Sequence, residues 1–284
     1  MRSLILIAVL LLNLQAKSLF SNAEQANTSK YIENLKNLII ATQKTRGLTN
    51  SYLNGNTTAM LLVYSNRDEM KSAIGNMEST PLAADPVINA RATAISKALI
   101  KLNQKAFKQK PQVIFSAYTE QIEQTLMLAQ TVSKRFAKDL TAFGKDTLSV
   151  MMETILPMAE YTGRLRGFGA GLAAKGKVSK SEYEKIQALS HQLLSLNRKL
   201  QNKMNAIISK YPNKLPVQIS SELSEVNKQT NAYVSFASKN FVANKEINAD
   251  PDKYFDQGTE LISAITKTYG IINSAILEDS KGWF

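Results

Sequence analysis

Two arginines in this chain combine a residue type and a position that could bind an anion. When residues 31–53 are aligned with residues 151–173, Arg46 coincides with Arg166, and Gly47 with Gly167. Both arginines continue an apolar stripe with helical spacing, so we expect both guanidinium groups to point inward. The other matched pairs are Tyr31 with Met151, Leu35 with Ile155, Leu38 with Met158, Thr42 with Thr162, and Leu53 with Ala173. Because arginine stays protonated and is costly to bury alone, each predicts a nearby acid or bound anion.

The shape of the guanidinium group indicates which anions would fit. Its parallel N–H groups match two coplanar oxygens, as in nitrate, nitrite, bicarbonate or a small carboxylate. Arg164 is a third candidate, but it ranks below Arg166 because two residues on a helix point about 200° apart. Nearby threonines could also donate hydroxyl groups to the anion; they are Thr42, Thr45 and Thr162. The alternative is that each arginine pairs with an acid of the protein, such as Glu33 or Glu160.

Glycines accompany these arginines inside segments with helical patterns. Each costs a helix about 1 kcal/mol relative to alanine, so a structural or functional gain must offset them. Close approach of two helices is one explanation, and room for a ligand beside the arginines is another that is compatible with it. The glycines concerned are Gly47, Gly163, Gly167, Gly169 and Gly171.

The residues needed for catalysis and metal binding are scarce. The chain has no cysteine, and its one histidine, His191, stands in the middle of a predicted helix. None of the sequence motifs typical of metalloproteases, hydrolases, nucleotide-binding loops or calcium loops is present. We therefore expect a protein that is not an enzyme and has no catalytic residues, no metal site and no cofactor.

The positive charge of the chain is broad rather than concentrated. The formal net charge is +12, from 35 basic and 23 acidic residues, and most basic residues are lysines scattered along helical segments. A nucleic-acid groove would instead combine arginines with aromatic side chains, so nucleic acid is not an expected partner. A positive field would still attract small anions.

Apolar spacing, capping residues and breakers predict an all-α protein. We expect two antiparallel four-helix bundles related by the internal repeat, the first over residues 24–142 and the second over 143–284. Asp85, Ser179 and Asp250 are predicted N-caps; Asp146 or Thr147 is predicted to cap the helix that carries Arg166. The expected helices are 24–54, 57–78, 86–108, 112–140, 146–174, 180–211, 217–241 and 251 to the C-terminal region.

The first residues have the pattern of a secretory signal peptide. Arg2 precedes an apolar run over residues 4–12, and Leu14-Gln15-Ala16 is an acceptable cleavage site. The predicted signal peptide is 1–16, with cleavage as late as Ala23 as the alternative. We therefore expect a periplasmic or secreted protein; an uncleaved N-terminal membrane anchor is the less favoured alternative.

Two motifs resemble the nitrate- and nitrite-sensing (NIT) domain family. Residues 43–53 read QKTRGLTNSYL and resemble the Gln-x-x-Arg-Gly motif of the family's first helix, and residues 160–167, EYTGRLRG, resemble its repeat. Residues 249–255 resemble the start of its last helix. The resemblance covers about residues 25–280.

The resemblance implies two four-helix bundles that hold nitrate or nitrite between them through Arg46 and Arg166. Family members usually carry an output module, and no segment here resembles one. The leading hypothesis is an exported sensor whose bundles shift on binding and whose change is read by a membrane-bound sensor kinase or chemoreceptor; the architecture also makes a homodimer a candidate assembly. The alternatives are a ligand-free helical adaptor with internal salt bridges and a receptor for another small ligand, such as an organic acid.

Overall fold

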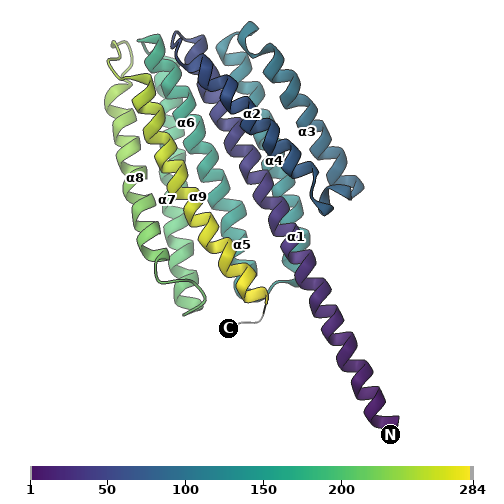
Figure 1. Cartoon of the computed structure of the whole chain (residues 1–284). Coiled ribbons are helices and arrows are strands. Elements are labelled where there is room, and N and C mark those ends of the chain that lie inside the picture. The colour runs from purple at the N-terminus through teal and green to yellow at the C-terminus, as the bar shows by residue number, and fades with distance from the viewer. Residues whose placement is uncertain (1, 282–284) are drawn as a thin grey trace.

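The chain folds almost entirely into helices (Figure 1). The computed structural model describes residues 2–281, and their side chains from residue 23 onward. The α-helices are α1 Arg2–Leu53, α2 Ala59–Glu78, α3 Pro86–Lys105, α4 Pro111–Phe136, α5 Ala142–Val150, α6 Leu156–Lys175, α7 Lys180–Lys210, α8 Ile219–Asn240 and α9 Pro251–Ser280. Short 3₁₀ turns cover Pro81–Ala84, Ala106–Lys108 and Ala137–Asp139, and a π turn covers Met151–Ile155. Within 2–281 the extended pairing is limited to one isolated bridge, Lys177 with Glu246.

The predicted capping residues begin three of these helices. Asp85 accepts hydrogen bonds from the first backbone N–H groups of α3, and Asp250 does the same for α9. Ser179 forms a capping box with Glu182 at the start of α7, and Gly176 ends α6 in the left-handed conformation. The three predicted N-caps are confirmed, and each is satisfied by backbone groups within a few residues of sequence.

Two predicted helix starts are wrong. The first helix begins at Arg2 rather than residue 24, because no proline or glycine interrupts residues 2–46. The helix preceding α6 begins at Ala142, where Thr141 accepts from the backbone N–H of Gly144. Asp146 instead accepts from Lys210 and Tyr211, and the Thr147 hydroxyl donates to the Phe143 carbonyl. The predicted signal peptide falls on residues whose side chains lie outside the described part of the structure.

A π turn joins α5 to α6. The backbone N–H of Leu156 donates to the carbonyl of Met151, five residues earlier, and Pro157 follows immediately. Proline has no N–H group and would clash with the preceding turn of a regular α-helix, and a π turn is one way to relieve this conflict. The helical run therefore continues through Pro157 into the segment that carries Glu160, Arg164 and Arg166.

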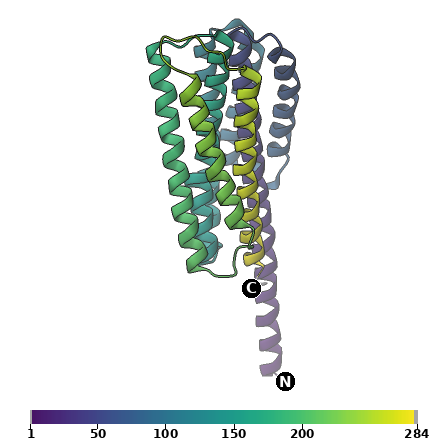
Figure 2. The same ribbon diagram turned by 90° about the vertical axis from the view of Figure 1, so that its left-hand side faces the viewer.

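Helices α1 and α6 lie side by side in the middle of the molecule (Figures 1 and 2). Helix α1 also packs on α2 and α4, whereas α6 also packs on α7 and α9; α3 packs on α4, and α8 packs on α7 and α9. The N-terminal part of α1 extends beyond the other helices (Figure 1). Helices α1–α4 therefore contact helices α5–α9 mainly through α1 and α6, which carry the matched arginines.

Glycines allow α1 and α6 to approach closely. A Cβ atom added to Gly167 would lie 2.8 Å from the Cα of Gly47, and one added to Gly163 would lie 2.8 Å from the Cδ of Gln43. Neither distance leaves room for a methyl group. The expectation that the glycines serve close helix approach is confirmed at this crossing.

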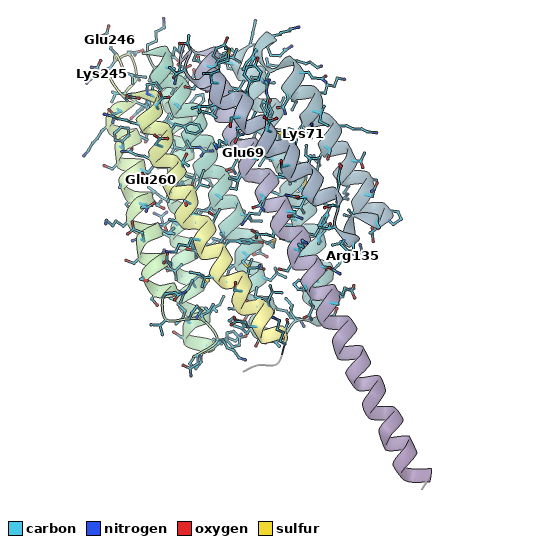
Figure 3. All side chains as sticks on the ribbon, viewed as in Figure 1. Glu69, Lys71, Arg135, Lys245, Glu246 and Glu260 are labelled. Atoms are coloured by element: carbon cyan, nitrogen blue, oxygen red, sulfur yellow. The ribbon has the colours of Figure 1, made fainter. Side chains whose placement is uncertain are left out.

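The helices bury an apolar core and leave many charged residues exposed. Charged side chains such as Glu69, Lys71, Arg135 and Glu260 are exposed (Figure 3). Over the residues whose side chains are described, none of the helices combines the length and the apolar character that crossing a bilayer requires. Among the side chains that the structure describes, Arg46 and Arg166 are the largest that are fully buried.

Candidate functional site

Arg46 lies inside the protein and is paired with a carboxylate. Its side chain has no exposed surface, and its NH1 and NH2 atoms lie 2.7 Å and 3.3 Å from Oε1 and Oε2 of Glu160. NH1 also donates to the hydroxyl of Thr119 at 2.9 Å, and the guanidinium Cζ lies 4.8 Å from the ring centroid of Phe115. The fork of Arg46 therefore holds two carboxylate oxygens of the protein itself.

Glu160 is held from three directions. Gln43 donates from Nε2 to Oε2 at 2.9 Å, and Arg164 donates from Nε to Oε1 at 2.7 Å, in addition to the contacts from Arg46. Arg164 is partly exposed and also donates to Glu123 at 2.6 Å. The acid alternative raised from the sequence is therefore right for Arg46, and Glu160 is its partner; Glu33 instead pairs with Lys36.

Arg166 has no such partner. It is 1% exposed, its NH1 donates to the hydroxyl of Thr259 at 2.8 Å, and its Cζ lies 4.4 Å from the ring centroid of Phe255. Its Nε and NH2 atoms are buried without a hydrogen-bond partner, and none of the ion pairs formed by the described side chains includes Arg166. Burial, assisted by the charge of Arg46, lowers the pKa of Arg166 to about 10. The guanidinium still carries its proton at neutral pH, so the structure buries a positive charge without a paired acid.

A neighbouring tyrosine does not supply the negative charge. A Cβ atom added to Gly258 would lie 2.7 Å from the hydroxyl of Tyr233 and 2.8 Å from Cβ of Arg166, so these two side chains flank the same glycine. Burial raises the pKa of Tyr233 well above its ordinary value. Tyr233 is therefore a neutral hydroxyl group at physiological pH, and can donate a hydrogen bond but not balance a charge.

The three threonines predicted from the sequence lie in this region, but two of them form hydrogen bonds to other groups. Thr162 donates to the carbonyl of Met158 in its own helix, and Thr45 accepts a hydrogen bond from Asn66. Thr42 is buried on α1. Their role as anion donors stays a prediction.

Two threonines that the sequence analysis did not select touch the guanidinium groups directly. Thr119 on α4 and Thr259 on α9 each accept from one arginine. A signal for them exists: residues 111–119 and 251–259 both have proline first, phenylalanine four residues later and threonine eight residues later. This second repeat has an offset of 140 residues rather than the 120 that relates the arginines.

Positive side chains gather at this site. Lys185 on α7 lies 4.4 Å above the ring of Phe168, and burial together with Arg164 and Arg46 lowers its pKa. Glu160 and Glu123 form ion pairs with Arg46 and Arg164, whereas Asp256 and Glu182 act on Arg166 and Lys185 without an ion-pair contact to them. No cluster of residues able to hold a metal ion occurs among the described side chains. The buried charge of Arg166, which no acid contacts, suits the binding of a small anion.

An all-helical protein with two matched arginines at a central helix crossing is typical of a known class of sensors. The family model for nitrate and nitrite sensing matches residues 37–276. The chain belongs to this family, which confirms the resemblance seen in the two arginine motifs. No curated protein matches the chain.

A solved structure shares the fold. The structure of the NasR transcription antiterminator matches 97% of this chain and 74% of its own, with a TM-score of 0.63 and 13% sequence identity. At this identity the likeness shows the arrangement of the helices.

Proposed function

We propose that this protein is a sensor that binds nitrate or nitrite at the crossing of α1 and α6, with Arg166 as the principal anion-binding residue. The single observation that carries the proposal is the burial of the Arg166 charge without an ion-paired acid, while its counterpart Arg46 forms an ion pair with Glu160. An uncompensated buried charge is destabilising, so proteins pair such groups or use them to bind ligands. Membership of the nitrate- and nitrite-sensing family supports nitrate or nitrite as the anion.

The contacts of Arg166 suit a flat anion with two or three oxygens. NH1 is engaged with Thr259, whereas NH2 and Nε retain hydrogen-bonding capacity on the same planar group. Thr259 donates its own hydroxyl proton to the carbonyl of Phe255 at 3.0 Å, and Phe255 covers one face of the guanidinium. The anion would therefore bind in the guanidinium plane, with the neutral hydroxyl of Tyr233 as an additional donor. Arg46, Arg164 and the predicted threonines Thr42, Thr45 and Thr162 form the surroundings of this site.

Signalling follows from the location of the site. In this proposal α1–α4 form one four-helix bundle, and α5–α9 form a second, in which α5, the π turn and α6 count as one helical run. The two bundles are related by the internal repeat, and Arg166 lies where they meet. Binding lowers the repulsion between Arg166 and Arg46, which favours a different arrangement of α1 against α6. The apolar segment 4–12 directs export, and a membrane-bound kinase or chemoreceptor, or a second copy of the chain, reads the change.

Thermal unfolding of the purified protein tests this function. Wild type, Arg166→Met and the exposed control Arg198→Met are compared in nitrate, nitrite, bicarbonate, formate, acetate and sulfate at constant ionic strength. A ligand at 100 times its Kd adds about 2.7 kcal/mol of stability, a readily measured rise in Tm. We expect nitrate or nitrite to stabilise wild type and Arg198→Met but not Arg166→Met. No response in any of the three proteins would instead favour a ligand-free adaptor, and an equal rise in all three would place anion binding away from Arg166.

A further inference from the structure

The two arginines occupy equivalent positions and share two kinds of neighbour. Each stacks on a phenylalanine, at 4.8 Å for Arg46 on Phe115 and 4.4 Å for Arg166 on Phe255. Each donates from NH1 to the threonine four residues after that phenylalanine, at 2.9 Å and 2.8 Å. Only Arg46 forms an ion pair with a carboxylate. Among these direct contacts of the two guanidinium groups, the negative charge is what distinguishes the halves.

The contacts across the helix crossing identify the position that lacks the acid. Gly47 meets Gly167, and Gln43 meets Gly163. Both pairs join residues 120 apart, as a local two-fold axis between α1 and α6 requires. The same operation that carries Arg46 onto Arg166 carries Glu160 onto position 40, where the chain has isoleucine.

A flanking cation with an exposed acid partner is present in both halves. The residue equivalent to Arg164 is Lys44; Arg164 binds Glu123 of α4, and Lys44 binds Glu69 of α2. Isoleucine at position 40 therefore stands where the Arg166 half would need a residue equivalent to Glu160.

We propose that Glu160 is an internal anion that occupies the first of two equivalent anion sites, so that the protein binds one small planar anion, at Arg166. This inference rests on the proposed function. A carboxylate and a nitrate ion present similar planar oxygens to a guanidinium group, which makes Glu160 a mimic of the bound ligand. Gln43 and Arg164 hold Glu160 in place, so a free anion at Arg46 would have to displace a tethered group with three donors.

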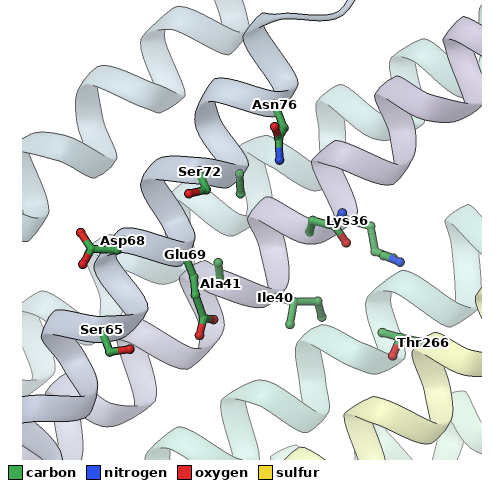
Figure 4. Close-up of a pocket in the computed structure, with 11 residues that line it drawn as sticks. Lys36, Ile40, Ala41, Ser65, Asp68, Glu69, Ser72, Asn76 and Thr266 are labelled. Atoms are coloured by element: carbon green, nitrogen blue, oxygen red, sulfur yellow. The ribbon is translucent and has the colours of Figure 1, made fainter.

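Position 40 is suited to a test because it borders an open groove. Ile40 lines a groove of about 650 Å³ with residues of α1 and α2 and with Thr266 of α9 (Figure 4). Glu69, the partner of Lys44, lines the same groove. The groove leaves room for a glutamate side chain at position 40. This glutamate would stand four residues before Lys44, just as Glu160 stands four residues before Arg164.

The number of bound anions distinguishes this inference from its alternatives. Urea unfolding is measured at increasing nitrate concentration, with ionic strength held constant by sodium fluoride. At saturation, the slope of the unfolding free energy against RT ln[nitrate] equals the number of ions released on unfolding. We expect a slope of one for wild type, two for Glu160→Gln, zero for Ile40→Glu, and one for the neutral control Ile40→Gln.

Each departure from these values has a separate meaning. A slope of one in all four proteins overturns the inference but leaves the proposed function intact. A slope of zero for wild type with one for Glu160→Gln overturns the proposed function at Arg166, while it supports Glu160 as an internal anion. If Glu160→Gln does not fold, equal slopes for Ile40→Glu and Ile40→Gln still overturn the inference, and loss of the slope in Ile40→Glu alone supports it.

Discussion

Replacement of Arg166 by methionine should stabilise the protein in the absence of a bound anion. Burial lowers the pKa of Arg166 from its ordinary value to about 10, which corresponds to about 3 kcal/mol against the charged form, at about 1.4 kcal/mol for each pKa unit. Methionine loses the hydrogen bond to Thr259 but still packs on Phe255, a net cost of about 1 kcal/mol. The expected gain is about 2 kcal/mol, or about 4 °C in Tm for a chain of this size.

The matched variant Arg46→Met should have the opposite effect. It removes the fork that holds both oxygens of Glu160, which is 1% exposed. Removing one partner of a buried ion pair costs about 3–5 kcal/mol, and the remaining donors Gln43 and Arg164 place the expected loss near the lower value. Differential scanning calorimetry of both variants and wild type in anion-poor buffer measures the two changes together.

The sign of the Arg166→Met effect decides between a receptor and a structural arginine. A loss of stability similar to that of Arg46→Met would show that Arg166 has a compensating negative charge within the folded protein. The reasoning about an uncompensated charge would then be refuted. Adding saturating nitrate supplies an internal check, because it should remove the advantage of Arg166→Met by stabilising only wild type.

Three further predictions concern the helix crossing, the threonine and the response to acid. Gly167→Ala should destabilise the protein by about 2 kcal/mol in urea unfolding, because the new methyl would lie 2.8 Å from the Gly47 backbone; Gly270→Ala, with nothing within 4 Å, should be neutral or stabilising by up to about 1 kcal/mol. Thr259→Val should weaken nitrate binding about tenfold in titrations, whereas Thr119→Val should leave it unchanged because Thr119 contacts the arginine already paired with Glu160. Hydrogen bonds from Lys210 and Tyr211 lower the pKa of Asp146 in the folded state, so the stability it contributes is complete above its unfolded pKa of about 3.9 and is lost as the pH falls through the folded value. Melting curves from pH 7 to pH 2 should therefore show a smaller acid-induced fall in Tm for Asp146→Asn than for wild type.

Helix positions were largely predictable because their determinants are local. The N-caps at Asp85, Ser179 and Asp250 each bond to backbone groups within three residues, and the spacing of apolar residues identified the buried faces. The N-terminal limit of α1 and the π turn before Pro157 were not predicted. Neither carries a strong local signal: the first lacks a helix breaker, and the second depends on how the chain accommodates proline inside a longer helical run.

The two buried arginines were also identified from the sequence, because a charge on an apolar stripe is visible without a structure. Their partners were not. Which arginine meets Glu160 depends on the rotation and register of α1 against α6, and Thr119 and Thr259 come from helices far along the chain. The sequence by itself determined that two cations would be buried near a glycine-rich crossing. Only the tertiary structure decided that one is neutralised by Glu160 and the other is not, because charge pairing between helices is settled by their packing rather than by residues near in sequence.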